Sequence, residues 1–341
     1  MTARTRHFIV ASLAVLGLGL GAGSIAYLTG AAAFTAAPGP DEMRFVPKDA
    51  TLVAFANVQE VMTSDLRQKM RDGGLLPGRG AGTLQGETGI NPETDIDRVV
   101  LGSVPGDGPA GPASDGVLLA RGRFDAVRIE RAMRDRGARV EEYKGVRIIT
   151  APRRADPRPD GRGPGGQPAA SPTLALAFLE PGLIAFGEEG QVRRAVDTGR
   201  GGESVLANDQ LITRIRPVEG QTLWAVGRLE GLPTERVTGG MLGQLPPISW
   251  FTASGRIDAG VKAHVTAETL DEAAANGLRD VVRGLMAIGR MQAGSRPELQ
   301  ALIQSVQIGG SGQAVTLSFD LSPQTLDMLA NGLRPPAGPR P

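Results

Sequence analysis

The chain has 341 residues, more than one ordinary domain of about 100–200 residues, and it is long enough to bury a real hydrophobic core. Its 37 basic and 36 acidic residues balance, so no overall field favours a nucleic-acid partner, and we expect none. Cysteine is absent, which excludes disulfides, thiolate metal sites and thiol nucleophiles. Packing alone must hold this protein together.

The N-terminus predicts a membrane anchor. Arg4 and Arg6 precede an uncharged stretch from Phe8 to Leu28. A membrane helix needs about 20 apolar residues and the core of a signal peptide about 7–15, so the length favours an uncleaved transmembrane helix. The small residues of "GAAAFTAA" keep a cleaved signal as the alternative.

Both alternatives export the remainder of the chain. The two arginines keep the N-terminus in the cytoplasm by the positive-inside rule. We therefore expect a single-pass protein of the bacterial cytoplasmic membrane with an extracytoplasmic C-terminal domain. Residues 1–40 then comprise a cytoplasmic stub, the anchor at about 8–28 and a small-residue stalk. The anchor is the part of the chain that contacts the membrane.

Residues 41–217 predict a first unit that mixes strands and helices. The unbroken apolar run over residues 52–56 is typical of a strand covered on both faces, and a helix is expected over about 59–71. Asn91 followed by Pro92 predicts a helix start, because asparagine caps a helix and proline suits its first position.

The most charged ordered stretch, residues 122–149, predicts a strand end, a helix and a hairpin. Asp125 is the expected cap of the helix, and Ile129 and Met133 fall on one apolar stripe. Arg128 and Arg131 point the other way. We interpret this charge as a solvated surface, with a surface for partner recognition as the alternative.

Two turns and an insertion complete the first unit. Lys144-Gly145 and Pro181-Gly182 predict tight turns, each between two strands, and a helix is expected near residues 190–198. Residues 152–172 are rich in Pro, Gly and charge and lack aromatic anchors. We expect a disordered insertion there, because such a segment cannot offset its ordering entropy.

Residues 218–332 repeat the plan. "QTLWAVGRLEG" is similar to "ATLVAFANVQE", and strands are predicted over 248–257 and 260–268. Thr269 and Glu272 form the expected capping box of a long helix. The apolar stripe of that helix is expected to contain Leu278, Val281, Val282, Leu285 and Ile288.

These elements predict an α+β fold. After the N-terminal transmembrane helix come two related units of antiparallel sheet, each with helices packed on one face, because hairpin signals outnumber parallel crossovers. Residues 333–341 are expected to form a disordered tail.

Four short motifs resemble a family of membrane-anchored bacterial extracytoplasmic proteins that is classed as a domain of unknown function. The motifs are Pro47-Lys48-Asp49-Ala50, Thr88-Gly89-Ile90-Asn91-Pro92 with Asp95-Ile96-Asp97, Gly122-Arg123-Phe124-Asp125, and Tyr143-Lys144-Gly145. The resemblance spans most of the exported region. It implies an extracytoplasmic location and brings no activity or catalytic residue with it.

The residue inventory leaves little material for catalysis. The two histidines are His7, beside the anchor, and His264, which alternates with polar residues along a predicted strand. A Ser-His-Asp triad or a two-histidine metal site is therefore not expected, and we predict no catalytic, cofactor or metal site and no cofactor. Trp224 and Trp250 lie in core-like strands and are interpreted first as packing anchors.

Three functions follow, in decreasing order of support. The first is a non-catalytic, membrane-tethered envelope module that binds or scaffolds a protein partner through a sheet or groove surface. The second is a periplasmic carrier or sensor of an apolar ligand, with a pocket lined by Trp224, Trp250, Phe251 and the helix after Thr269. The third is a hydrolase. The candidate contact residues are Trp224, Trp250, Phe251, Arg128 and Arg131.

Overall fold

The computed structural model describes residues 40–72, 89–104, 116–152, 173–229, 246–294 and 297–332. No helix within these ranges is long and apolar enough to cross a membrane. The predicted anchor and stalk, the tail, and all of the insertion except Pro152 lie outside the described residues.

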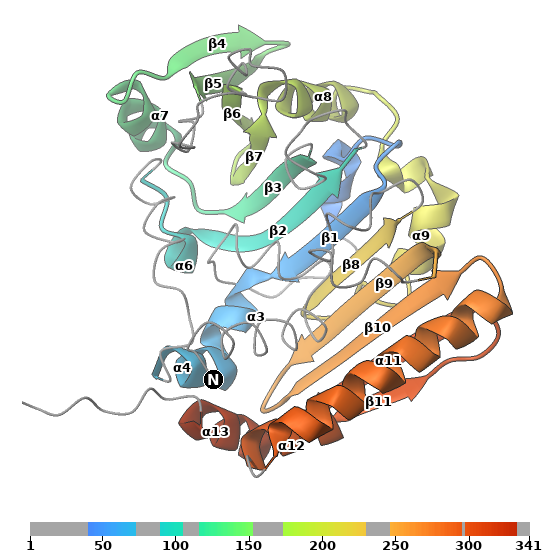
Figure 1. Ribbon diagram of the computed structural model, residues 1–341. Coiled ribbons are helices and arrows are strands. Elements are labelled where there is room, and N and C mark those ends of the chain that lie inside the picture. The colour runs from blue at the N-terminus through green and yellow to red at the C-terminus, as the bar shows by residue number, and fades with distance from the viewer. Residues whose placement is uncertain are drawn as a thin grey trace, which may run out of the picture.

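The described strands form one antiparallel sheet of twelve strands (Figure 1). Their order across the sheet is β11-β12-β10-β9-β8-β1-β2-β3-β7-β6-β5-β4. The strands are β1 (Leu52–Asn57), β2 (Ile96–Ser103), β3 (Gly116–Gly122), β4 (Arg139–Tyr143), β5 (Val146–Pro152), β6 (Thr173–Glu180), β7 (Leu183–Glu188), β8 (Leu223–Arg228), β9 (Ile248–Ile257), β10 (Val261–Thr269), β11 (Val306–Gly309) and β12 (Ala314–Leu321).

The α+β prediction is confirmed, but the two predicted units do not form separate sheets. β1 pairs with β2 on one side and with β8 on the other, so the first strand of each half lies beside the other at the middle of the sheet. This pairing leaves neither strand with an unpaired edge, and it joins the halves into one hydrogen-bonded surface.

Eleven helical segments in the described ranges accompany the sheet. They are η1 (Asp41–Phe45), α3 (Val58–Thr63), α4 (Asp65–Asp72), α6 (Pro92–Asp95), α7 (Ala126–Arg134), α8 (Glu189–Gly199), η2 (Val205–Ala207), α9 (Asp209–Ile215), α11 (Glu272–Ala293), α12 (Pro297–Gln304) and α13 (Pro323–Gly332).

Helices pack on both faces of the sheet, so the prediction of helices on one face is wrong. The face that we call the α8 face is covered by η1, α8, η2 and α9. The opposite face, the α11 face, is contacted by α3, α7 and α11. The reason lies in the strands: the consecutive residues Val53 and Ala54 point to opposite faces and are both fully buried.

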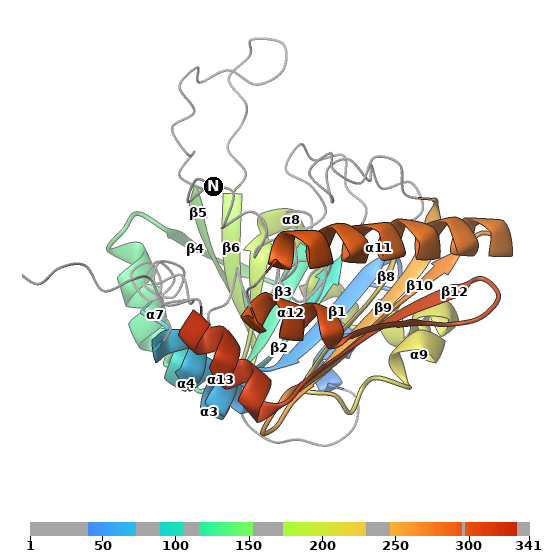
Figure 2. The ribbon, with the colours of Figure 1, turned by 60° about the horizontal axis from the view of Figure 1, so that its bottom comes forward.

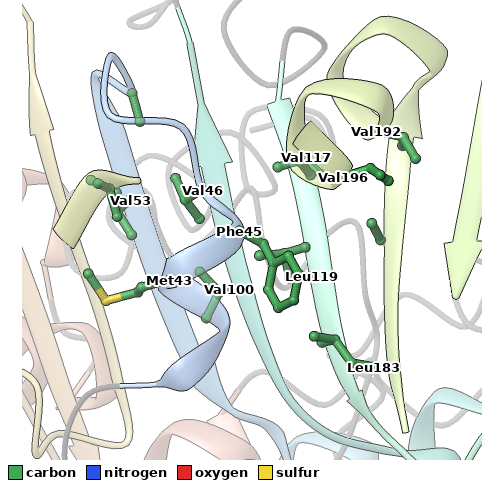
Figure 3. Packing of buried hydrophobic residues seen from close by; sticks show 14 of the residues in the cluster. Met43, Phe45, Val46, Val53, Val100, Val117, Leu119, Leu183, Val192 and Val196 are labelled. Atoms are coloured by element: carbon green, nitrogen blue, oxygen red, sulfur yellow. The ribbon is translucent and has the colours of Figure 1, made fainter. Parts of the chain in front are cut away.

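The core of the α8 face lies between the strands and the segments that cover them. Val192, Ala195 and Val196 lie three and four positions apart on α8, so they form one apolar stripe that is fully buried. Figure 3 shows Val192 and Val196 of this stripe, and the same buried cluster contains Leu119 of β3 and Phe45 of η1.

The two halves arrange their strands in the same order. The first half runs β1-β2-β3-β7-β6 across the sheet and the second runs β8-β9-β10-β12-β11, with the hairpin β4-β5 present only in the first. A helix on the α11 face follows the third strand of each half, and another helix follows the last strand.

The last helices of the two halves lie in different places. α8 turns back over the sheet and contacts β3, β6 and β7, whereas α13 packs beside α12 and α4 (Figure 2). Among the described residues of the second half, no helix therefore takes the place that α8 has in the first half.

Several local predictions are confirmed. The side chain of Asp125 caps α7 by accepting a hydrogen bond of 3.0 Å from the backbone N–H of Arg128. Lys144 and Gly145 take φ values of 50° and 75° in the turn between β4 and β5, and Gly182 takes 73° between β6 and β7. These left-handed conformations suit tight hairpin turns.

Other local predictions need correction. The cap of α11 is Asp271, whose Oδ1 accepts a 2.7 Å hydrogen bond from the N–H of Ala274, whereas the hydroxyl of Thr269 donates to backbone carbonyls. Ile288, expected in the buried stripe, is 50% exposed. The helix predicted over 59–71 is divided at Ser64 into α3 and α4.

Candidate functional site

Within the described ranges, no helix covers the α8 face over β9, β10 and β12 in the way that α8 covers it over β3, β6 and β7. Directly paired residues form three polar rows there, because opposite residues of an antiparallel pair share a face. The rows, which we call the open face, are Arg256–Lys262–Asp320, His264–Ser318 and Thr252–Thr266–Thr316; Ser254, the neighbour of His264 on β9, is buried.

Hydrogen bonds across the strands order the open face. His264 Nδ1 lies 3.1 Å from the hydroxyl oxygen of Ser318, and the hydroxyl oxygens of Thr266 and Thr316 lie 3.2 Å apart. His264 is exposed and the other three residues are half-buried. The face thus presents hydroxyl, imidazole and charged groups on rigid strands.

The opposite face of the same strands is covered by α11. Ala275, Leu278 and Val282 of this helix are buried against Val315 of β12 and against Ala267 of β10. Figure 2 shows α11 lying along one side of these strands. The second half is therefore closed and apolar on the α11 face, and polar and open on the other.

An aromatic and ionic cluster borders the open face on the side of α9. Arg214 of α9 binds Glu268 with two hydrogen bonds, of 3.0 Å from Nε and 2.6 Å from Nη2. Its guanidinium also lies 4.3 Å from the centre of the Trp250 ring. Trp250 is half-buried, so this predicted contact residue lies at the border of the open face.

The other two predicted pocket residues lie elsewhere. Trp224 is buried on the α8 face and stacks on Phe55, with 5.8 Å between ring centres. Phe251 is buried on the α11 face, as expected for a residue that follows Trp250 in a strand. The predicted pocket formed by Trp224, Trp250, Phe251 and the long helix is therefore not present, because the sheet separates its residues.

Arg128 and Arg131 lie far from this region. Both are exposed on α7, which packs near the end of the sheet formed by β4 and β5 (Figure 1). Sequence reasoning missed Glu130, which lies between them: it is 5% exposed, and its carboxylate pairs with Arg134 at 2.8 Å and with Arg147 at 3.0 Å. The sequence signal for its burial was its place next to Ile129, which belongs to the apolar stripe of the helix.

A separate polar cleft of about 800 Å³ opens on the α8 side of the molecule. It lies between the chain before β1, the end of α8 and the start of α9. Its lining residues are Pro47, Lys48, Asp49, Arg194, Asp197, Thr198, Gly202, Glu203, Ala207, Asn208, Asp209 and Gln210.

One carboxylate of the cleft is fixed from outside it. Tyr143 donates its hydroxyl to Asp197 at 3.1 Å, and the Lys144 ammonium lies 2.6 Å from Asp197 Oδ1. The hydrogen bond from Lys144 lowers the pKa of Asp197 below its ordinary value, and the same bond raises the pKa of Lys144. The part of the chain that the structure describes contains no group of three acidic or histidine side chains able to hold a metal ion.

Comparisons with known proteins do not identify a family or a function for this chain. No protein-family model and no curated protein sequence matches the chain. Crystal form I of TP0453 is a similar solved structure, with a TM-score of 0.42 and 10% sequence identity over 89% of this chain and 100% of that one. At this level the likeness assigns no function.

Proposed function

We propose that the protein is a non-catalytic binding or scaffold module of the bacterial envelope, tethered to the cytoplasmic membrane by residues 8–28, and that the open face is its partner surface. The observation that carries the proposal is the different course of the two last helices. α8 covers its part of the sheet, whereas α13 packs mainly against α12 and α4, so no helix in the described ranges covers the corresponding strands.

The side chains of the open face suit a contact that forms and breaks. Their polar character keeps the face soluble when it is empty, whereas an apolar face would promote aggregation. Their position on paired strands means that little conformational entropy is lost when a partner docks.

The charges of the open face indicate the kind of partner. Lys262 lies between Arg256 and Asp320 in one row, and hydroxyl groups and the imidazole of His264 form the other two. Such a mixture favours a protein surface that is itself polar and carries both signs of charge, because each buried charge then finds an opposite one.

The alternative function, a carrier or sensor of an apolar ligand, required a pocket formed by Trp250 and Phe251 together. These two residues lie on opposite faces of the sheet. No observation in the described ranges favours the hydrolase over the binding module.

Site-specific photo-crosslinking in the native host tests the proposal. A photoreactive residue at Thr266 or Thr316 should give one discrete crosslinked protein, because both positions lie inside the open face. The matched control is position 283 on α11, where the Arg283 side chain is 63% exposed on the other side of the sheet. Equal products from all three positions, or none from the open face, would contradict the proposal.

A further inference from the structure

The two outer edges of the sheet differ in charge. β4 and β11 are the outermost of the described strands, so no described strand pairs with the outer edge of either. β4 exposes the charged residues Arg139, Glu141 and Glu142. In contrast, residues 299–319, which contain β11, carry no charged side chain. Charged side chains on an edge strand oppose pairing with another chain, and β11 lacks this protection.

The backbone of β11 offers hydrogen bonds to a further strand. β11 pairs with β12 on one side, where Gln307 lies opposite Ser318. The bonds of an antiparallel pair alternate along each strand, so about half of the N–H and C=O groups of β11 point away from β12. Val306 and Ile308 are half-buried, and Gln307 is exposed. A further strand would satisfy these backbone groups and cover the two apolar side chains.

The side chains of β11 suit pairing with a second copy of the same strand. In an antiparallel pair centred on Gln307, Val306 of each copy lies opposite Ile308 of the other, and apolar groups meet on one face. The two glutamines lie opposite each other on the other face, without charge. The same arrangement of β4, centred on Glu141, would bring two glutamates directly opposite each other, which is destabilising.

We propose that the protein forms a homodimer in which β11 of one copy pairs antiparallel with β11 of a second copy, so that one sheet runs through both. The twofold axis of such a pair is perpendicular to the sheet, and the α8 faces of the two copies therefore lie on the same side. η1, the first described element of the chain, belongs to this face. The proposed tethers of both copies can thus reach one membrane.

The short length of β11 fits association on a membrane. β11 has four residues, so its pairing alone buries less area than the roughly 1,200–2,000 Å² of stable interfaces in solution. Two chains tethered to one membrane meet at a raised effective concentration, which strengthens a weak contact. The dimer uses the proposed tether but not the partner of the open face, so the two proposals can fail separately.

Disulfide crosslinking of the full-length chain in the membranes of its native host tests the dimer. The chain has no cysteine, so Gln307→Cys introduces a single thiol. Mild oxidation should link it into a reducible product of twice the mass of the chain, because the two positions lie directly opposite each other. The matched control is Glu142→Cys, an exposed position on the other edge of the sheet, which should stay monomeric. A monomer from Gln307→Cys, or equal dimer from both variants, would overturn the inference.

Charge at the same position gives a second test with a rescue. Two full-length copies with different affinity tags are expressed together in the host, and their co-purification measures pairing. Gln307→Glu in both copies should weaken pairing about fivefold, because like charges then lie opposite each other. Gln307→Glu in one copy with Gln307→Lys in the other should restore it. Melting curves check that these variants are folded. No co-purification of the unchanged copies, or no recovery in the mixed pair, would contradict the dimer.

Discussion

The two halves of the sheet have the same strand order but finish the α8 face differently. In the first half, β3 and β7 present Leu119 and Ala185 to α8, and both side chains are fully buried. In the second half, β10 and β12 carry the half-buried Thr266 and Thr316 at the corresponding place. The comparison teaches that the residues on one strand face, more than the order of strands, decide whether a helix covers that face.

The largest expected effect comes from placing a charge under α8. Val196→Asp should lower the free energy of unfolding by about 4 kcal/mol or more, because an ionised carboxylate would be buried without a partner. The same acidic residue on the open face, in Thr266→Asp, should cost less than about 1 kcal/mol. Urea unfolding of both variants measures the difference. Similar losses for the two would show that the open face is covered in solution.

Removing a buried carboxylate should have the next largest effect. Glu42 of η1 is fully buried, and its Oε1 accepts hydrogen bonds from Nε of Arg98 at 3.2 Å and from Nε of Arg121 at 2.7 Å. Glu42→Ala should cost about 3 kcal/mol, because Arg98 and Arg121 would lose the buried carboxylate that they share, although Arg121 keeps Glu180 at 3.6 Å.

Glu268→Ala is the matched change beside the open face. Its ion pair with Arg214 is partly exposed, so the loss should stay below about 1 kcal/mol. Thermal melting compares the two. A larger loss of stability for Glu268→Ala than for Glu42→Ala would contradict this expectation. It would mean that the partly exposed ion pair stabilises the fold more than the buried one.

The charged face of α7 should matter less than either. Arg128→Gln together with Arg131→Gln should change stability by no more than about 0.5 kcal/mol and leave the crosslinks from the open face unchanged, since both side chains are exposed. Ile129→Asp, one position from Arg128, should instead cost several kcal/mol because Ile129 is buried. Loss of the crosslinked product from the Gln variant would make α7 the recognition surface.

The smallest effect should be a dependence on pH at the end of α8. Because the folded protein lowers the pKa of Asp197, the contacts of its carboxylate with Lys144 and Tyr143 stabilise the fold above the ordinary aspartate range near 3.8. That stabilisation is lost as the pH falls through the lowered pKa. The difference in unfolding free energy between the unchanged chain and Asp197→Asn should therefore shrink toward zero on acidification from pH 6. A difference that is constant with pH would contradict it.

Local sequence signals predicted local structure well. Asp125, Lys144-Gly145 and Pro181-Gly182 act within a few residues of themselves, so their cap and turns were visible in the sequence. The same reasoning chose Thr269 in place of Asp271 as the cap of α11, because both residues can cap a helix and the contact of Thr269 with Gln313 is not local.

The long-range arrangement was not predictable in the same way. The pairing of Phe55 with Trp224 joins residues far apart in the chain, and nothing near either one specifies it. The separation of Trp250 from Phe251 was predictable, because neighbouring residues in a strand point to opposite faces. The alternation of polar and apolar residues along β10 was also visible in the sequence. Predicting the open face would have required knowing that β10 pairs with β12.

The central claim is that the open face binds a partner, and the affinity of the crosslinked partner tests it most directly. The purified partner should bind the chain carrying Thr266→Glu and Thr316→Glu at least about tenfold more weakly than the unchanged chain, because two unmatched charges would be buried in the contact. The matched control, Arg283→Glu with Arg290→Glu on α11, should bind normally, because both residues are exposed. Equal affinity for the unchanged chain and the open-face variant, with both folded, would contradict the account.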